Sequence, residues 1–354
     1  MQEKASTITS QPLSRKKKLL FMLIWISFFF LGTEILWRGL GFKTLPEAPS
    51  MEGSEKLIGV PLHPGVCYSL VPNASGIHAG VQVKTNSLGF RDGPRSETKS
   101  PETLRILVLG DSMVFGQAVD QEKVFTRVLE KKLGPPFEVW NAGHCAYNTK
   151  EEYFFFKHRG LKFQPDLVIL GYCLVNDTID CQSAEKDYQQ TQQEQKQGWF
   201  QLRIRFEKRS AFFHWLAQNV EYALANTKKI AYLNQLYDEK HWTESAPYLR
   251  KIYELCQIRK IPLYLLIFPI TYAEEPRNHF QQYEFSHLNQ KVRQTLDGLS
   301  EVTVIDLLPA LIQHQQQHPD QLLLVPYDGH PNEIYHSLTA EVLSSHVRKT
   351  FSLK

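Results

Sequence analysis

Short apolar runs alternate with helix-length amphipathic segments through most of the chain after residue 100, and this alternation constrains the fold more than any other feature. The run Arg105–Gly110 (RILVLG) is continuous in apolar residues and ends at a glycine, as expected of a strand covered on both faces. The other expected strands are Phe137–Trp140, Leu167–Leu170, Pro262–Phe268 and Val302–Ile305, and the expected helices are Lys123–Leu133, Glu151–Gly160, Ala246–Gln257, Phe285–Leu299 and about Glu333–Val347. This order predicts an α/β fold with an open parallel sheet and helices on both faces.

The N-terminus carries an uncharged segment, Leu19–Thr33, behind the basic residues Arg15–Lys18, and apolar residues extend it to Trp37. A helix from residue 19 to residue 37 would be about 28 Å long, close to the hydrocarbon core of a bilayer. The positive-inside rule puts the basic residues in the cytoplasm and everything after Trp37 outside it. A cleaved signal peptide has a similar layout, but Glu34 and Arg38 do not form a small-residue cleavage site, so an uncleaved single-pass anchor is favoured.

Charge and composition exclude several classes of protein. Residues 1–18 hold five Lys or Arg against one Glu, a net charge of +4, whereas the whole chain carries +3, so the remainder is nearly neutral. A nucleic-acid-binding protein usually has a basic face on its folded part, and none is expected here. With 42% hydrophobic and 22% charged residues, the chain is neither disordered nor a multi-span membrane protein.

The five cysteines give a weaker indication. Their odd number leaves at least one outside any internal disulfide, and no C-x-x-C spacing supports a zinc or thioredoxin-type motif. Cys173 and Cys181 could close a short loop in an oxidising compartment. The sequence does not decide between these states.

Four parts follow from these patterns: a cytoplasmic tail (1–18), a transmembrane anchor (19–37), an extracytoplasmic lead-in (38–100) and a main domain (101–354). The lead-in is rich in Pro, Gly and Ser and ends in Asn86–Pro94, which reads as a turn and tether. The main domain carries an insertion at about 180–245, with a Gln-rich stretch followed by the aromatic segment Phe200–Ala225. The insertion is either a lid over a site at the strand ends or an exposed helical excursion.

Polar residues follow three of the expected strands and precede the last helix. They are Gly110–Asp111–Ser112, Asn141–Ala142–Gly143, Asn176–Asp177 and Asp328–Gly329–His330. Ligands of open parallel sheets bind outside the carboxyl ends of the strands, so these groups are expected to meet at one edge.

Together these residues can supply the parts of an acyl-transfer site. Ser112 would be the nucleophile, His330 the base that activates it, and Asp328 the carboxylate that orients the imidazole. The backbone N–H groups of Ser112 and Gly143 and the side-chain amide of Asn176 would stabilise the oxyanion. Three neighbours are candidates to line the pocket: Asp111, His144 and Asp177.

These four blocks resemble those of the SGNH hydrolases, also called GDSL hydrolases, over roughly residues 105–346. The lead-in segment 86–91 resembles that of a membrane-anchored subgroup. The resemblance implies a flavodoxin-like three-layer sandwich with a mostly parallel five-stranded sheet, and a serine esterase or acyltransferase that needs no metal or other cofactor. In the last block Asp328 lies two residues before His330, where the usual spacing is three, and Gly171 is further from Asn176 than in most members.

The sequence therefore predicts a serine esterase that cleaves an O-acyl or O-acetyl ester through an acyl-serine, its substrate a small molecule or an envelope carbohydrate. The alternatives are an O-acetyltransferase that modifies an exported polysaccharide and a catalytically silent protein that binds glycans or proteins. A metal hydrolase built on His314 and His318 is a weaker alternative, because Gln315 stands where a base would be expected and no third ligand is evident.

Overall fold

The computed structural model describes residues 14–44, 49–175, 177–178, 193, 197–217, 220, 235, 237–269, 280, 283–296, 298–325 and 328–352. The chain forms two compact units. One contains the N-terminal helix and residues 193–224, and the other contains residues 48–192 and 225–354.

The larger unit is built on a five-stranded sheet in the order β6 (Phe137–Gly143), β5 (Leu104–Gly110), β7 (Leu167–Cys173), β8 (Leu263–Phe268) and β9 (Val302–Asp306). Every neighbouring pair is parallel. Numbered along the chain, this is the 2-1-3-4-5 order of the flavodoxin-like fold. The predicted fold class is confirmed, and the sheet is parallel throughout.

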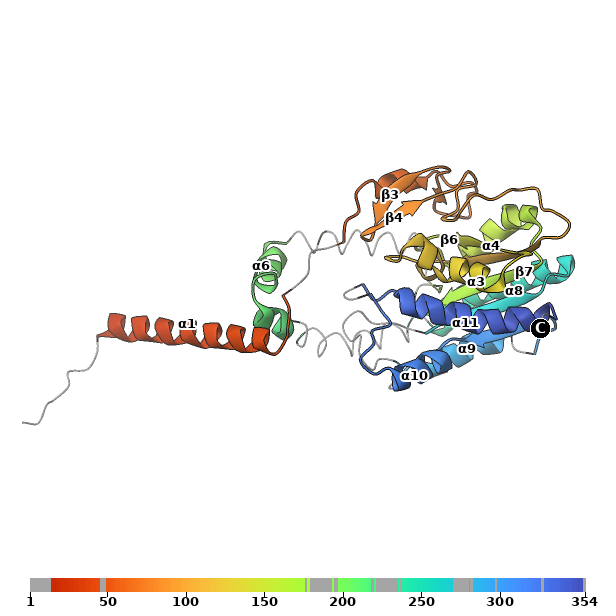
Figure 1. Cartoon of the computed structure of the whole chain (residues 1–354). Helices are drawn as coiled ribbons and strands as arrows, with labels where there is room; N and C mark the ends of the chain where they lie inside the picture. Colours follow the sequence, from red (N-terminus) through yellow and green to blue (C-terminus); the bar gives the residue numbers. More distant parts are fainter. Residues whose placement is uncertain are drawn as a thin grey trace, which may run out of the picture. The chain divides into compact units, whose positions relative to one another are not determined.

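Helices cover both faces of this sheet (Figure 1). One face packs against α4 (Thr149–His158), α8 (Glu239–Arg259) and α9 (Ser286–Leu296), and the other against α3 (Phe125–Leu133), α10 (Leu308–Gln317) and α11 (Glu333–Thr350). Alternate residues of β5 serve the two layers: Leu107 and Leu109 face the first, and Ile106 and Val108 the second. The sheet is therefore buried on both sides, which explains the unbroken apolar runs.

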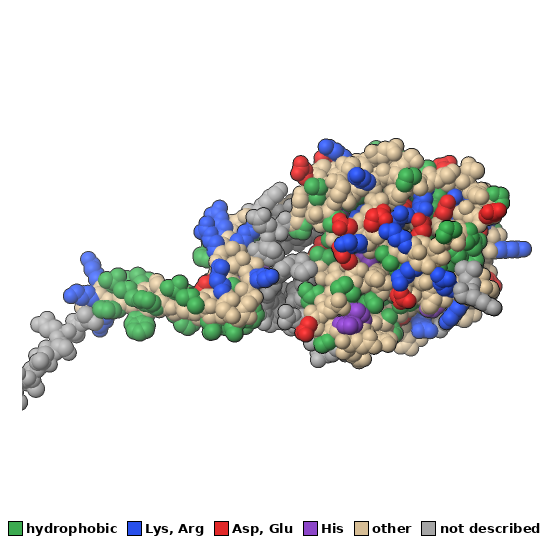
Figure 2. Space-filling view, in the orientation of Figure 1, with side chains coloured by type: hydrophobic (Ala, Val, Ile, Leu, Met, Phe, Trp, Pro, Cys, Tyr) green, Lys and Arg blue, Asp and Glu red, His purple; other side chains and the backbone are tan. Residues whose placement is uncertain are grey.

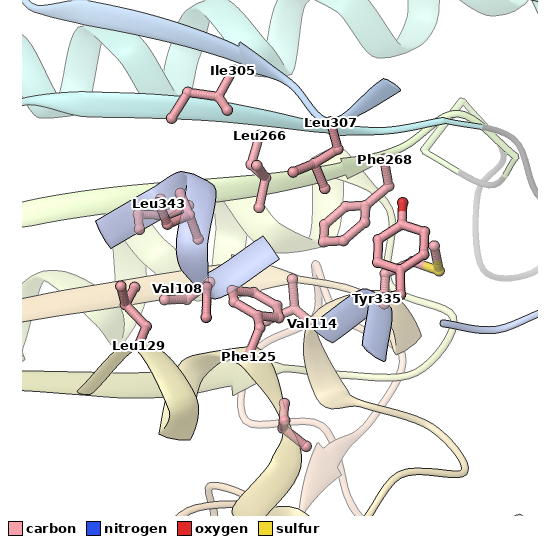
Figure 3. Packing of buried hydrophobic residues seen from close by; sticks show 14 of the residues in the cluster. Val108, Val114, Phe125, Leu129, Leu266, Phe268, Ile305, Leu307, Tyr335 and Leu343 are labelled. Carbon is pink, nitrogen blue, oxygen red and sulfur yellow. The ribbon is translucent and has the colours of Figure 1, made fainter. Parts of the chain in front are cut away.

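Figure 3 shows the second layer from close by. Phe125 and Leu129 of α3 and Leu343 of α11 lie around Val108, and Leu266 of β8 belongs to the same cluster. Burial of these side chains fixes α3 and α11 side by side on one face of the sheet (Figure 1). This packing also fixes where the N-terminal ends of both helices lie.

Element boundaries differ from the predicted ones mainly at the carboxyl ends of strands. β6 and β7 each continue three residues further, to Gly143 and Cys173, because the polar residues there still pair with β5 or β8. α8 begins at Glu239 rather than Ala246 and accommodates Pro247 within its length. α10 was not predicted, because its polar residues obscure the helical pattern.

The lead-in packs against the sheet and belongs to the same compact unit. It contains η1 (Ser54–Leu57), β1 (Ile58–Gly59), β2 (Ser69–Leu70), β3 (Ser75–His78) and β4 (Val81–Lys84), with β1 paired to β2 and β3 to β4 in antiparallel fashion. Val83 and Phe90 are fully buried, and the Phe90 ring packs edge-on against Trp140, at 5.7 Å between centroids. The remaining short helices of this unit are α2 (Ser112–Phe115), η2 (Gln121–Lys123) and η3 (Gly160–Phe163).

The smaller unit joins α1 (Arg15–Gly39) to part of the insertion. α1 is the one helix of the described residues that is long and apolar enough to cross a membrane, and no residue of its apolar window is buried. α6 (Gly198–Glu207) and a second helix at 211–217 belong to the same unit. The Gln-rich stretch of the insertion lies outside the described residues.

Cysteine pairing differs from the bridge considered above. Cys67 is disulfide-bonded, whereas Cys145, Cys173 and Cys256 are free thiols. The Cys173–Cys181 bridge is therefore wrong, because Cys173 is buried at the end of β7 as a free thiol.

Candidate active site

The turn after β5 presents Ser112 at the start of α2. Asp111 caps this short helix by accepting a hydrogen bond from the Met113 N–H, at 2.9 Å. Gly116 ends the helix with φ 83°, a left-handed conformation that favours glycine. Ser112 retains about 9% of its surface exposed in an otherwise buried turn. As the first residue of the helix, it has a backbone N–H without an intrahelical acceptor.

A second loop, immediately before α11, presents His330 and Asp328. The Val325 N–H donates to the His330 carbonyl at 2.8 Å, and the Asn332 N–H donates to Leu323 at 3.0 Å. Asn332 also caps α11 by accepting from the Ile334 and Tyr335 N–H groups. The loop is thus tied at its base while His330 and Asp328 stay half-buried and reachable.

The two loops bring a serine, a histidine and an aspartate into one hydrogen-bonded chain. The Ser112 Oγ lies 2.8 Å from the His330 Nε2, and the His330 Nδ1 is hydrogen-bonded to the Asp328 Oδ1. Burial raises the pKa of Asp328, but the hydrogen bond and charge of His330 outweigh it and hold this pKa below its ordinary value. An ionised Asp328 fixes the imidazole with its Nε2 free to take the serine proton.

Gly143, the candidate oxyanion donor at the end of β6, lies directly against the nucleophile helix. A Cβ at this position would come within 2.3 Å of the Phe115 nitrogen, so only glycine fits. The Gly143 N–H donates to the Asn141 Oδ1 at 3.0 Å, and the Asn141 amide donates in turn to the Val114 carbonyl at 2.9 Å. An oxyanion would have to share the Gly143 N–H with Asn141. Asn176 lies outside the described residues.

The three residues predicted to line the pocket are all fully buried: Asp111, His144 and Asp177. Asp177 accepts from the Thr149 hydroxyl at 2.8 Å and from the Cys173 N–H, so it ties α4 to the end of β7. Burial lowers the pKa of His144 to about 4, and its ring stacks on Tyr147 with centroids 4.5 Å apart. These side chains are buried against the loops of the site and have almost no surface exposed to solvent.

Gln117 and His78 are neighbours of the triad that the sequence did not point to. The Gln117 Nε2 lies 3.3 Å from both the Asp328 Oδ2 and the His330 Nδ1. His78, at the tip of the β3–β4 hairpin, is hydrogen-bonded to Gln117 and packs edge-on against Phe115, at 5.8 Å between centroids. Burial lowers the pKa of His78, which favours its neutral form. No motif spacing marks either residue, because each reaches the site only through tertiary packing.

Arg91 links the lead-in to the nucleophile turn. Its buried guanidinium donates to the carbonyls of Phe115, Gly116 and Val119. Burial lowers the pKa of Arg91 to about 10, which leaves the group charged at neutral pH. The end of α2 is therefore held by a residue that lies before the sheet in sequence.

Other nucleophile and metal chemistries find less support in the described residues. Cys145 is the other nucleophile candidate near the site, but burial and the charge of Asp111 raise the pKa of its thiol to about 12, so it stays protonated. His314 and His318 stack with centroids 4.6 Å apart, and His314 is hydrogen-bonded to Gln321. Across the described ranges, no group of three or more His, Cys, Asp or Glu is placed to hold a metal ion.

No model of a protein family matches this sequence, and no curated protein matches it. Solved structures with similar folds include an acetyl xylan esterase, AlAXEase, with a TM-score of 0.43 and 15% identity over 69% of this chain and 100% of that chain. A catalytic mutant of an acetylxylan esterase from Geobacillus stearothermophilus has a TM-score of 0.41 and 14% identity, covering 71% of this chain and 96% of that one.

A lipolytic protein of the G-D-S-L family from Desulfitobacterium hafniense has a TM-score of 0.37 and 16% identity, covering 69% of this chain and 99% of that one. These three structures are thus two acetyl xylan esterases and one lipolytic protein of the G-D-S-L family.

Proposed function

We propose that this chain is a serine esterase of the SGNH type. The observation that carries the proposal is the hydrogen-bonded chain from Ser112 through His330 to Asp328, with 2.8 Å between the Ser112 Oγ and the His330 Nε2. A serine hydroxyl becomes a strong nucleophile only when a base lies within hydrogen-bond reach of it. The backbone N–H of Ser112, at the start of α2, adds a donor that can stabilise negative charge.

The reaction proceeds in two halves. The Ser112 Oγ attacks the ester carbonyl carbon while its proton passes to the His330 Nε2. The resulting oxyanion accepts hydrogen bonds from the Ser112 N–H and from the Gly143 N–H, which it shares with the Asn141 Oδ1. The alcohol then leaves with the proton from His330, and an acyl-serine remains. Water attacks this acyl group as His330 takes a proton, and release of the carboxylic acid restores Ser112.

The proposed location is a membrane, with the N-terminus in the cytoplasm and the catalytic domain outside it. The support is the exposed apolar surface of α1 behind Arg15–Lys18. The disulfide at Cys67 agrees with an oxidising compartment. From this location, the substrate we propose is an O-acyl or O-acetyl ester, carried by an envelope carbohydrate or a small molecule.

Replacing Ser112 tests the proposal directly. Ser112→Ala is expected to lower the hydrolysis of p-nitrophenyl acetate by roughly 10³-fold or more, because the nucleophile is lost while the fold is not. A fluorophosphonate probe should label the wild-type chain and leave the variant unlabelled. Ser100→Ala, which removes an exposed hydroxyl ahead of the sheet, is the matched control and should behave as wild type.

Two other outcomes would each favour a different function. Equal turnover in the wild type and Ser112→Ala, with no probe labelling, would favour a catalytically silent binding protein. Probe labelling with negligible hydrolysis, but with transfer of acetyl groups to added oligosaccharide, would favour an O-acetyltransferase. Both enzymes pass through the same acyl-serine and differ only in whether water or a sugar hydroxyl accepts the acyl group.

A further inference from the structure

The described part of the insertion packs against the C-terminal end of α1 through hydrogen bonds to a carboxylate and through aromatic contacts. Glu34 of α1 accepts hydrogen bonds from the Ser210 hydroxyl at 2.6 Å, the Ala211 N–H at 3.0 Å and the Phe212 N–H at 3.3 Å. Its carboxylate thus caps the helix at 211–217 from outside. Arg38 of α1 also donates to the Arg209 carbonyl at 3.0 Å.

Aromatic rings extend this contact along α1. The Phe30 ring lies 6.4 Å, centroid to centroid, from both Phe212 and Phe213. Trp37 packs edge-on against Phe212 at 5.2 Å and against Trp215 at 5.0 Å. The contact therefore covers two turns of α1, from Phe30 to Trp37.

The position of this contact along α1 indicates how deep it lies in a bilayer. Phe30 lies seven residues before Trp37, which in an α-helix is about 10 Å along the axis. If Trp37 marks the outer edge of the hydrocarbon core, Phe30 lies well inside it, and the rings that touch Phe30 must lie in the lipid as well. The capping of Glu34 supplies the hydrogen bonds that a carboxylate at this depth would otherwise lack.

α6 has the composition of a helix that lies on a bilayer surface. Trp199, Leu202 and Phe206 recur at helical spacing and are 61%, 54% and 48% exposed. Figure 2 shows Lys and Arg side chains gathered over the same segment, and Arg205, Lys208 and Arg209 are exposed there. Exposed Trp and Phe beside exposed cations suit the boundary between acyl chains and anionic headgroups.

We infer that residues 198–217 form a second membrane contact, seated in the outer interface of the bilayer beside α1, with the lipid surface as its partner. This inference rests on the membrane anchoring proposed above and is independent of the esterase chemistry. It assigns the aromatic part of the insertion to the membrane and makes α1 part of the mature fold, because cleavage after Trp37 would remove the partner of Ser210 and Phe212.

Lipid photolabelling of the full chain tests this inference. The chain is reconstituted in phosphatidylethanolamine–phosphatidylglycerol vesicles that contain a phosphatidylcholine with a diazirine on its acyl chain, and adducts are mapped by mass spectrometry. Adducts are expected in peptides from 198–217 as well as in α1. The double variant Trp199→Glu with Phe206→Glu should lower the adducts in 198–217 by about fivefold or more and leave those in α1 unchanged.

A control variant separates a specific loss of adducts from a general effect of an added charge. Ile258→Glu makes the same exchange at a 75% exposed apolar residue of α8 and should change nothing. Adducts in α1 with none in 198–217 would overturn the inference and leave the anchor standing. Adducts in neither would overturn the anchor too, while p-nitrophenyl acetate turnover in the same vesicles reports separately on the esterase.

Discussion

At the scale of single residues, the site combines side chains that the sequence marks with side chains that it does not. Ser112 and His330 follow from their motifs, and the spacing of Asp328 departs from the usual one, yet its carboxylate reaches the His330 Nδ1. The two-residue spacing works because Gly329 adopts φ 79°, so the chain folds back between them. Gln117 completes the arrangement from the end of α2 without any sequence signal.

Gln117 is expected to position Asp328 and His330 rather than touch substrate. Gln117→Ala should lower kcat by about 3- to 30-fold with KM within about twofold, because the hydrogen bond from its amide to the Asp328 Oδ2 is lost. The measurement is steady-state hydrolysis of p-nitrophenyl acetate. A rise in KM at constant kcat would instead make Gln117 a substrate contact.

Glu152 of α4 is expected to make stability depend on pH. It is fully buried, and neither carboxyl oxygen has a hydrogen-bond partner among the described residues. Burial, then the charge of Asp177, raises its pKa well above the ordinary 4.5. The folded chain thus holds this proton more tightly than the unfolded one, and stability falls as pH rises above about 4.5 towards the folded-state pKa.

Glu152→Gln tests this expectation, because an amide cannot ionise. The free energy of unfolding should rise by about 1–3 kcal/mol at pH 8 and by little at pH 4, measured by urea titration. Glu55→Gln, on exposed η1, is the matched control and should be neutral at both values. A gain of equal size at both pH values would contradict the pH linkage.

At the scale of elements, the lead-in belongs to the same compact unit as the five-stranded sheet. Its hairpin β3–β4 carries His78 to the triad, and Arg91 holds three carbonyls at the end of α2. The segment Asn86–Pro94, predicted as a turn and tether into the main domain, contains Arg91, which contacts the end of α2. Turns and short strands use the same residue types as linkers, so composition alone does not show how closely the lead-in packs.

Arg91→Met is expected to lower the free energy of unfolding by about 2–4 kcal/mol, because buried carbonyls at 115, 116 and 119 lose their donor. Esterase activity at a temperature where the variant is folded should fall as well, since α2 carries Ser112. Lys84→Met, at an exposed residue of β4, is the matched control. Wild-type stability in Arg91→Met would show that the lead-in does not brace the turn.

At the scale of the whole molecule, the chain consists of the unit with the five-stranded sheet and a second unit of α1 with residues 193–224. The second unit is held by Glu34 and the aromatic contacts of Phe30 and Trp37. The sequence suggested a lid or an exposed helical excursion for the insertion, and its described residues contact α1. The sequence shows the aromatic residues but not their partner, which lies more than 170 residues earlier.

The intact mass of the mature chain is expected to include α1. Retention follows from the contacts of Glu34, which would leave Ser210 and the N-terminus of the helix at 211–217 without their acceptor after cleavage. Mass spectrometry of the chain purified from membranes measures the intact mass and so identifies the N-terminal residue. A mature N-terminus beyond residue 37 would contradict both the anchor and the interfacial contact.

The sequence by itself determined the α/β class of the fold and the apolar N-terminal helix, because both depend on local periodicity. The proposed triad of Ser112, His330 and Asp328 also came from the sequence, through motifs at strand ends and before the last helix. Only the tertiary structure decided that Gln117, His78 and Arg91 belong to the site and that Asp111, His144 and Asp177 are buried beneath it. Burial and contacts across long stretches of chain come from how layers pack, and side chains that meet through packing leave no fixed spacing in the sequence.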